Sequence, residues 1–250
     1  MPEERDGGAG RIRWVFLDLG SVLLDEGAWI QLTHARALRE LRTTLPSLSL
    51  REVKGCLEHP PPNTTALQAL LSRYLLDPEE RATLLAQIRE STAEAYYRLG
   101  TPVAGAREVL EELSGRYSLG ILANQRPEAH DWLRRHDLAD LFGVLGLSCD
   151  AGYSKPDPRL FAWALERAGC APHEAVMVGD RPDNDIAPAR RLGMATVRVR
   201  CLGEHTHQEP QTPDEQADVT VGSLAEVPEA LARVAGEQGG DEPPRVRGLT

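Results

Sequence analysis

Acidic and amide side chains follow several apolar runs of this chain directly. The residues in these positions are Asp18, Asn124 and Asp180. Short apolar runs of this kind are typical of buried strands, and open α/β sheets bind ligands at the carboxyl ends of their strands. We therefore expect these three side chains to meet at one edge of a sheet.

Further charged residues belong to the same set. Lys155 lies in a loop stiffened by prolines before an expected helix, and Asp183 and Asp185 follow shortly after Asp180. Carboxylates that share a small space repel one another and raise one another's pKa unless a cation neutralises them. Oxygen ligands of this kind suit Mg²⁺. A nucleophilic Asp, a divalent cation and a Lys together predict phosphoryl transfer.

The chain resembles the haloacid dehalogenase superfamily, whose four motifs match, in order, Asp18, Asn124, Lys155 and Asp180. The resemblance covers about residues 12–232, and its most specific segments are 152–161 and 178–186. Most members of this superfamily are magnesium-dependent phosphatases, so the resemblance implies Mg²⁺ as the cofactor and a small phosphorylated substrate.

The resemblance also implies a role for each matching residue. It makes Asp18 the catalytic nucleophile and Lys155 the group that stabilises both the nucleophile and the phosphoryl charge. The implied metal ligands are Asp18, the Gly20 carbonyl, Asp180 and, directly or through water, Asp185. The implied substrate-binding residues are Ser21, Asn124 and Lys155.

Two positions depart from the family pattern. The first motif usually carries a second Asp that acts as general acid and base, and here Gly20 stands in its place. Ala123 replaces a Ser or Thr that contacts the phosphoryl group. General acid–base catalysis contributes about 10²–10⁴ in rate, and a hydrogen bond to a charged group about 1.5–3 kcal/mol. Without compensation, the pattern predicts a slow enzyme or a former one.

Three functions are compatible with these residues. The first is a phosphohydrolase with Asp18 as nucleophile, and the absence of an acid at position 20 favours acyl or aryl phosphates over alkyl phosphates as its substrates. The second is a catalytically lapsed binding or regulatory module that keeps the fold and the metal. The third is a haloacid dehalogenase, in which an Asp displaces halide without a leaving-group acid.

Simpler structural roles also place such residues at these positions. Asp18 suits a strand-to-helix turn, and acids suit the first turn of a helix. Lys155 could be an ordinary exposed lysine, and Asn124 could tie its loop together. The family spacing selects Asp185, five residues after the first acid of the motif, and leaves Asp183 as a bystander.

The composition excludes several classes of partner. The chain has 250 residues and a formal net charge of −10, with no basic stripe that interleaves aromatic residues, so we expect no nucleic-acid partner. No run reaches 18 apolar residues and the first ten are too polar for a signal peptide, so we expect no membrane partner and a cytoplasmic location. The four widely spaced cysteines predict reduced thiols.

The order of the expected elements predicts an α/β fold with a Rossmann-like parallel sheet and helices on both faces. Helices and strands alternate from residue 101 onward, whereas the segment before it is helical throughout. We expect a core of residues 11–27 and 100–235 and a small α-helical cap of residues 28–99. Residues 1–10 and 236–250 are expected to be disordered tails.

Within the expected cap, helices are predicted over 29–42 and 64–76, and a third from Asp77, with Glu80 placed to close a capping box. Trp29 lies where a cap hinge would overlook the site and could touch substrate. The polar stretch 203–216, with His205 and His207, is predicted to be a solvated surface loop.

Overall fold

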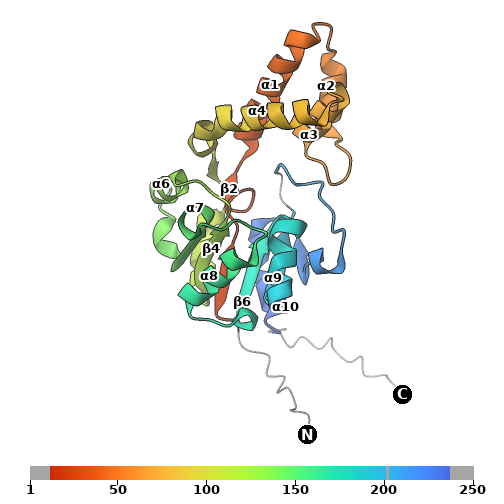
Figure 1. Cartoon of the computed structure of the whole chain (residues 1–250). Helices are drawn as coiled ribbons and strands as arrows, with labels where there is room; N and C mark the ends of the chain where they lie inside the picture. The colour runs from red at the N-terminus through yellow and green to blue at the C-terminus, as the bar shows by residue number, and fades with distance from the viewer. Residues whose placement is uncertain (1–11, 201–202, 237–250) are drawn as a thin grey trace, which may run out of the picture.

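The computed structural model describes residues 12–200 and 203–236. Within these ranges the main sheet has six parallel strands, namely β1 (Trp14–Leu17), β4 (Ser118–Ala123), β5 (Val144–Leu147), β6 (Ala175–Gly179), β7 (Ala195–Val199) and β8 (Val219–Val221). They are arranged in the order β5-β4-β1-β6-β7-β8 (Figure 1). All five pairings between neighbouring strands are parallel.

The apolar strands form because both faces of the sheet are covered, which favours near-continuous hydrophobic runs. Along β1, Val15 and Leu17 pack into one hydrophobic layer, whereas Phe16 packs into the layer on the opposite face. This alternation follows from the two-residue repeat of a strand. The helices α5 (Ala106–Ser114), α6 (Glu128–Arg135) and α10 (Val227–Val234) contribute to the first layer.

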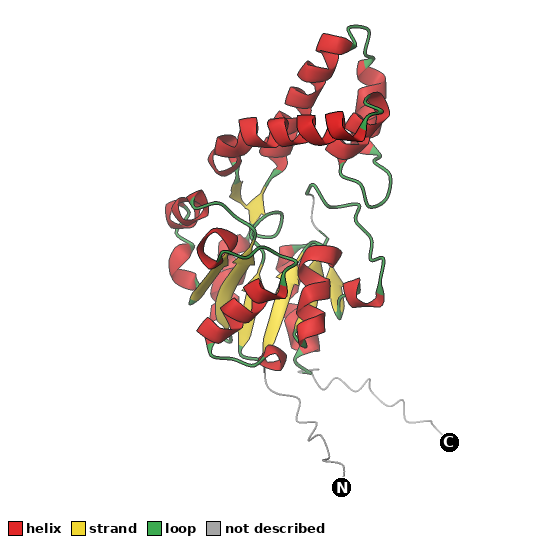
Figure 2. Cartoon of the chain, in the orientation of Figure 1, coloured by secondary structure: helices red, strands yellow, loops and turns green. Residues whose placement is uncertain are grey.

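The second face is covered by α8 (Pro158–Ala168) and α9 (Ala187–Leu192). A four-residue helix, α7 (Ser148–Ala151), follows β5 directly. The helices surround the strands in the view coloured by secondary structure (Figure 2). The predicted α/β fold with helices on both faces of a parallel sheet is therefore confirmed.

Four further helices form what we call the helical module, which comprises α1 (Gly27–Thr44), α2 (Leu50–Glu58), α3 (Ala66–Tyr74) and α4 (Pro78–Leu99). The module enters and leaves through a short antiparallel pair, β2 (Leu24–Asp25) and β3 (Thr101–Pro102). It has a hydrophobic cluster of its own, which includes Leu41, Leu70 and Ile88. Figure 1 shows the module lying beyond one end of the sheet.

Helix starts in the module differ in detail from the prediction. Asp77 caps α4 through a hydrogen bond from the Glu79 N–H, because its short side chain reaches the second helical residue, and Glu80 closes no capping box. A capping box forms instead at α3, where Thr65 and Gln68 bond reciprocally. Helix α2 was not among the predicted helices, since Val53 is the only residue that it buries fully.

Some sequence predictions fall outside the part of the chain that the structure describes. The predicted tails, residues 1–10 and 236–250, lie outside it except for Gly236, and so does Cys201. No helix among the described residues is both long and apolar enough to span a bilayer.

The strand order fixes where a ligand site belongs. From the central strand β1, the sheet extends through β4 on one side and through β6 on the other. This is the arrangement of a doubly wound fold, in which ligands bind outside the carboxyl ends of the strands where the strand order reverses. The crevice is therefore expected beside the ends of β1 and β6.

Candidate active site

Two buried carboxylates meet where β1 and β6 end. Leu17 pairs with Val178 in the parallel register, so the chain leaves the two strands at almost the same level. Asp18 follows β1 immediately and Asp180 follows β6 immediately, and the Asp18 N–H still donates to the Val178 carbonyl at 2.9 Å. The sheet register thus brings together two residues that are 162 positions apart in sequence.

Lys155 reaches this edge from the loop before α8. Its Nζ lies 2.9 Å from Asp18 Oδ1 and 2.6 Å from Asp185 Oδ1, and its side chain is almost completely buried. The Asn124 amide holds the main chain of Lys155 from both sides. The Lys155 N–H donates to Asn124 Oδ1 at 2.6 Å, and Asn124 Nδ2 donates to the Lys155 carbonyl at 2.9 Å.

These contacts favour the alternative that Asn124 ties the lysine loop in place. Its side chain still lines the pocket, but its amide oxygen and nitrogen are both engaged with Lys155.

The two acids that follow Asp180, Asp183 and Asp185, lie in different environments. Asp185 lies in a single π-helical turn, Pro182–Ile186, is fully buried, and accepts the Arg181 N–H at Oδ2 over 2.9 Å. Its side chain lies so close to Gly179 that a Cβ there would approach it to 2.5 Å. Asp183 instead forms a partly exposed ion pair with Arg181 at 2.8 Å.

The site carries an excess of negative charge. Oxygens of Asp18, Asp180 and Asp185 lie within 4.8 Å of one another, and Lys155 provides one ammonium group among them. Burial raises the pKa of Asp18 to about 6, against the pull of Lys155. Burial, with the nearby charges of Asp185 and Asp18, also raises the pKa of Asp180 well above its usual range.

The ammonium of Lys155 remains charged in this environment. Burial opposes its charged form, but the carboxylates of Asp18 and Asp185 outweigh burial and hold its pKa above the usual value. Three carboxylates around one ammonium leave about two negative charges uncompensated when all are ionised. Such an arrangement of oxygen donors fits a hard divalent cation such as Mg²⁺.

A further carboxyl group, that of Glu26, enters the site from the turn before α1. Its Oε1 accepts a hydrogen bond from the Tyr96 hydroxyl at 2.6 Å, and its Oε2 accepts one from the Ser21 hydroxyl at 2.8 Å. Burial raises its pKa to about 7. Sequence reasoning missed this residue, because an acid at the start of an expected helix is ordinary and nothing in the local pattern sets it apart.

The turn after Asp18 is shaped by this carboxyl. Ser21 has a left-handed backbone, with φ of 59°, and its hydroxyl faces Glu26. Ala123, at the position of the missing hydroxyl, packs into the hydrophobic layer at the end of β4. The Ser148 hydroxyl lines the pocket near this end of the sheet, where it bonds to the main chain of Gln125. No feature of the sequence around Ser148 marks it as a site residue.

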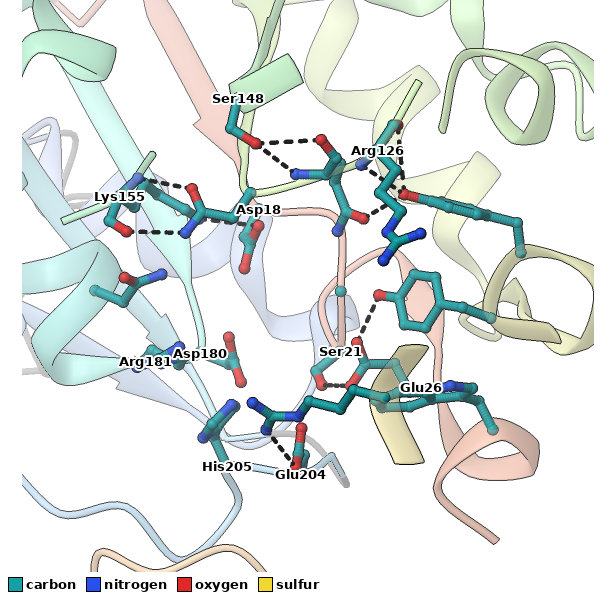
Figure 3. Close-up of a pocket in the computed structure, with 18 of the residues that line it drawn as sticks. Asp18, Ser21, Glu26, Arg126, Ser148, Lys155, Asp180, Arg181, Glu204 and His205 are labelled. Atoms are coloured by element: carbon teal, nitrogen blue, oxygen red, sulfur yellow. Dashed lines mark hydrogen bonds and ion pairs between the residues drawn. The ribbon is translucent and has the colours of Figure 1, made fainter. Parts of the chain in front are cut away.

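A pocket of about 470 Å³ connects these groups, and Figure 3 shows the side chains that point into it. Its wall combines the sheet edge, the helical module and the 203–216 loop. The lining residues are Asp18, Gly20, Ser21, Glu26, Trp29, Arg89, Ala93, Tyr96, Tyr97, Asn124, Gln125, Arg126, Ser148, Lys155, Asp180, Arg181, Asn184, Glu204 and His205.

The prediction of a purely solvated loop at 203–216 was wrong for His205, which is half-buried in the pocket wall. The loop is held against the helical module by an ion pair between Arg89 and Glu204 at 3.1 Å. Asn63 adds a second connection, since its Oδ1 accepts the Glu209 N–H at 2.7 Å. His207 is exposed, as expected.

Trp29 lines the same pocket, where its indole N–H donates to the Thr92 hydroxyl at 3.2 Å. Its ring packs edge-on against Tyr96. A pocket with an aromatic wall and a few convergent polar groups is typical of a small-molecule site.

Residues 15–199 match the family model of the haloacid dehalogenase-like hydrolases. The protein therefore belongs to this family. The fold, with its six-stranded parallel sheet, agrees with that membership.

Relatives include phosphatases. The chain is 32% identical to glyceraldehyde 3-phosphate phosphatase of Methanopyrus kandleri over 66% of its own length and 71% of the relative. It is 28% identical to glyceraldehyde 3-phosphate phosphatase of Pyrococcus furiosus over 93% of its length and 97% of the relative. It is also 39% identical to phosphoserine phosphatase of Thermus thermophilus, but over only 44% of its length and 43% of the relative.

Solved structures with a similar fold include a dehalogenase. The 2-haloacid dehalogenase of Pseudomonas syringae pv. Tomato is 26% identical, with a TM-score of 0.56 over 89% of this chain and 99% of that one. A phosphatase of the same family from Thermococcus onnurineus is 23% identical, with a TM-score of 0.57 over 88% of this chain and 98% of that one.

Proposed function

We propose that the protein is a magnesium-dependent phosphatase that uses Asp18 as nucleophile on a small phosphorylated metabolite. The observation that carries this proposal is the buried cluster of three carboxylates around the Lys155 ammonium, open to a pocket of about 470 Å³. The phosphatases among the relatives support the same reaction class.

In the proposed mechanism, a carboxylate oxygen of Asp18 attacks phosphorus and forms an aspartyl phosphate. The Asp18 carboxylate is oriented for attack by the Leu19 N–H, at 2.8 Å, and by Lys155. The same lysine stabilises the negative charge of the phosphoryl group, because it is fixed in place before the reaction begins.

Asp18, Asp180, Asp185 and the Gly20 carbonyl are the groups we assign to hold Mg²⁺. The bound cation would supply charge neutralisation for the phosphoryl oxygens. Asp185 contacts Lys155 and the Arg181 N–H, so its contribution includes fixing the position of the lysine.

We propose that the helical module acts as a cap on the core, with the domain bounds expected from the sequence, 28–99 for the cap and 11–27 with 100–235 for the core. It supplies Trp29, Arg89, Tyr96 and Tyr97 to the pocket wall, so it limits the size of the substrate. Ser21 and Lys155 are assigned to substrate binding, and Asn124 contributes by positioning Lys155.

A panel of substrates tests the proposed function. We expect Mg²⁺-dependent release of inorganic phosphate from at least one small phosphate ester or acyl phosphate, and no halide release from a 2-haloacid. The control is the same panel in EDTA. Halide release would support the dehalogenase alternative, and magnesium binding without turnover on any compound would support the lapsed module.

Magnesium binding is expected to stabilise the protein more at high than at low pH. In the metal-free protein the pKa values of Asp18, about 6, and of Asp180 lie above those of the unfolded chain. The folded state then binds more protons than the unfolded state, so these groups reduce stability increasingly as the pH rises from about 4 through 6 and beyond. Mg²⁺ binds the ionised carboxylates and removes this penalty.

The measurement is the increase in melting temperature on adding millimolar Mg²⁺, at about pH 8 and about pH 5.5. We expect the larger increase at pH 8, and about 2.7 kcal/mol of stabilisation where Mg²⁺ is at 100 times its Kd. Asp180→Asn should lose most of the increase, whereas Asp183→Asn should keep it. An equal increase at both pH values would contradict the assignment.

A further inference from the structure

The space beside Gly20 is occupied by the carboxyl of Glu26. A Cβ placed on Gly20 would lie 2.6 Å from Glu26 Oε1 and 2.9 Å from the Tyr96 hydroxyl oxygen. Such distances are too short for any side chain, so position 20 has to be glycine while Glu26 keeps this position. A carboxyl group is therefore present where the first motif lacks one, and it comes from a residue six positions later in the chain.

Two hydrogen bonds also fix the position of the Glu26 carboxyl. Its two oxygens accept hydrogen bonds from groups on opposite sides, the Tyr96 hydroxyl of the helical module and the Ser21 hydroxyl of the turn after Asp18. Its side chain lines the same pocket as Asp18 and Lys155, and Figure 3 shows it beside Ser21 on the pocket wall. General acid–base catalysis requires a carboxyl within hydrogen-bond reach of the leaving group, and Glu26 is held in the wall of the pocket that Asp18 and Lys155 also line.

We propose that Glu26 is the general acid and base of the reaction, in place of the acid that is missing at position 20. This role rests on the proposed phosphatase function.

Over one turnover, Glu26 gives one proton to the leaving group and regains one from water. While the bond from Asp18 to phosphorus forms and the bond from phosphorus to the leaving oxygen breaks, the Glu26 carboxyl gives its proton to that oxygen, which departs as an alcohol. Water then attacks phosphorus and gives a proton to the Glu26 carboxylate. The bond between phosphorus and Asp18 breaks, phosphate leaves, and both carboxyl groups return to their starting states.

This assignment revises the substrate preference expected from the sequence. With no acid at position 20, alkyl phosphates were expected to be poor substrates. With Glu26 as proton donor, the wild type can hydrolyse them, because their leaving groups depart protonated. Gly20→Asp alone should bring little gain, since the new side chain would have to displace the Glu26 carboxyl from its present position.

The test compares kcat/KM on phosphate esters whose leaving groups become progressively poorer, from p-nitrophenyl phosphate to an alkyl phosphate, with Mg²⁺ present. Glu26→Gln keeps the size of the side chain, and its amide oxygen can still accept one of the two hydroxyls, while its NH2 can donate to the oxygen of the other. We expect a loss of about 10²–10⁴ on the alkyl phosphate and less than about tenfold on p-nitrophenyl phosphate. Glu94→Gln, an exposed glutamate of α4 outside the pocket lining, is the matched control and should leave both rates unchanged.

A second variant pair covers the case in which Glu26→Gln disturbs the fold. Glu26→Ala removes the carboxyl, and Gly20→Asp in the Glu26→Ala background places one at the vacated position. We expect the double variant to recover at least about tenfold of the activity on the alkyl phosphate that Glu26→Ala loses, within the range of general acid–base catalysis.

The outcomes separate this role from the proposed function. An active wild type with an equal loss on every leaving group in Glu26→Gln, or with no loss, overturns the role of Glu26 alone. A wild type that releases no phosphate from any ester, although it binds Mg²⁺, overturns the proposed function and this role with it. A loss that grows as the leaving group becomes poorer supports both.

Discussion

Asp18→Asn is expected to reduce the Mg²⁺-dependent phosphatase activity by more than about a thousandfold, because an amide cannot form the aspartyl phosphate. The variant should remain folded, since the Lys155 ammonium keeps its contact with Asp185 at 2.6 Å. Its metal-free form should be at least as stable as the wild type, because a buried charge is removed from a site with an excess of negative charge.

The measurement is kcat on the best substrate of the panel, together with thermal unfolding in EDTA. Asp183→Asn is the matched control, because it makes the same change in an acid that forms a partly exposed ion pair with Arg181. It should retain activity within about threefold, as expected for a surface substitution. Wild-type turnover in Asp18→Asn would show that another group attacks phosphorus.

Lys155→Met should have the largest effect on stability. The substitution leaves Asp18 and Asp185 buried without the ammonium that lies 2.9 and 2.6 Å from them. Removing one partner of a buried ion pair costs about 3–5 kcal/mol. We also expect a fall in kcat of at least about 10², the scale for losing one fixed group that stabilises the transition state.

The free energy of unfolding in denaturant, measured at about pH 8 in EDTA, checks this prediction. The deficit should shrink as the pH falls, because protonation neutralises the unpaired carboxyls, and it should shrink on addition of Mg²⁺. Lys54→Met is the control, since Lys54 forms an exposed pair with Glu58 at 3.5 Å, and we expect a change within about 0.5 kcal/mol. An unchanged stability of Lys155→Met would mean that the ion pairs in the site are not formed in solution.

The residues to which we assign catalytic roles come from two parts of the molecule, the sheet edge and the entrance to the helical module. Asp18, Lys155 and Asp180 belong to the sheet edge, whereas Glu26 lies at the entrance to the helical module and is held by Tyr96 of that module. If Glu26 transfers protons, any movement of the helical module relative to the sheet would also move the proton donor. Closure of the pocket and completion of the catalytic groups would then be one event.

The sequence by itself determined the sheet and much of the site. Apolar runs that end in Asp18, Asn124 and Asp180 predicted strands whose ends meet, because strands buried on both faces must be apolar and a polar residue ends the buried stretch. The resemblance to the family, whose second acid lies five residues after the first, singled out Asp185 from Asp183, and the structure brings Asp185, not Asp183, to Lys155.

Only the tertiary structure decided which groups complete the pocket. Glu26, Ser148 and His205 have no neighbours in sequence that mark them, and their positions depend on the packing of the helical module and the 203–216 loop against the sheet edge. In the sequence, Gly20 stands where the family pattern has an acid. In the fold, the absence of a side chain at Gly20 leaves room for the carboxyl of Glu26. Such a replacement depends on the distance between atoms in space, which a pattern of residue types along the chain does not contain.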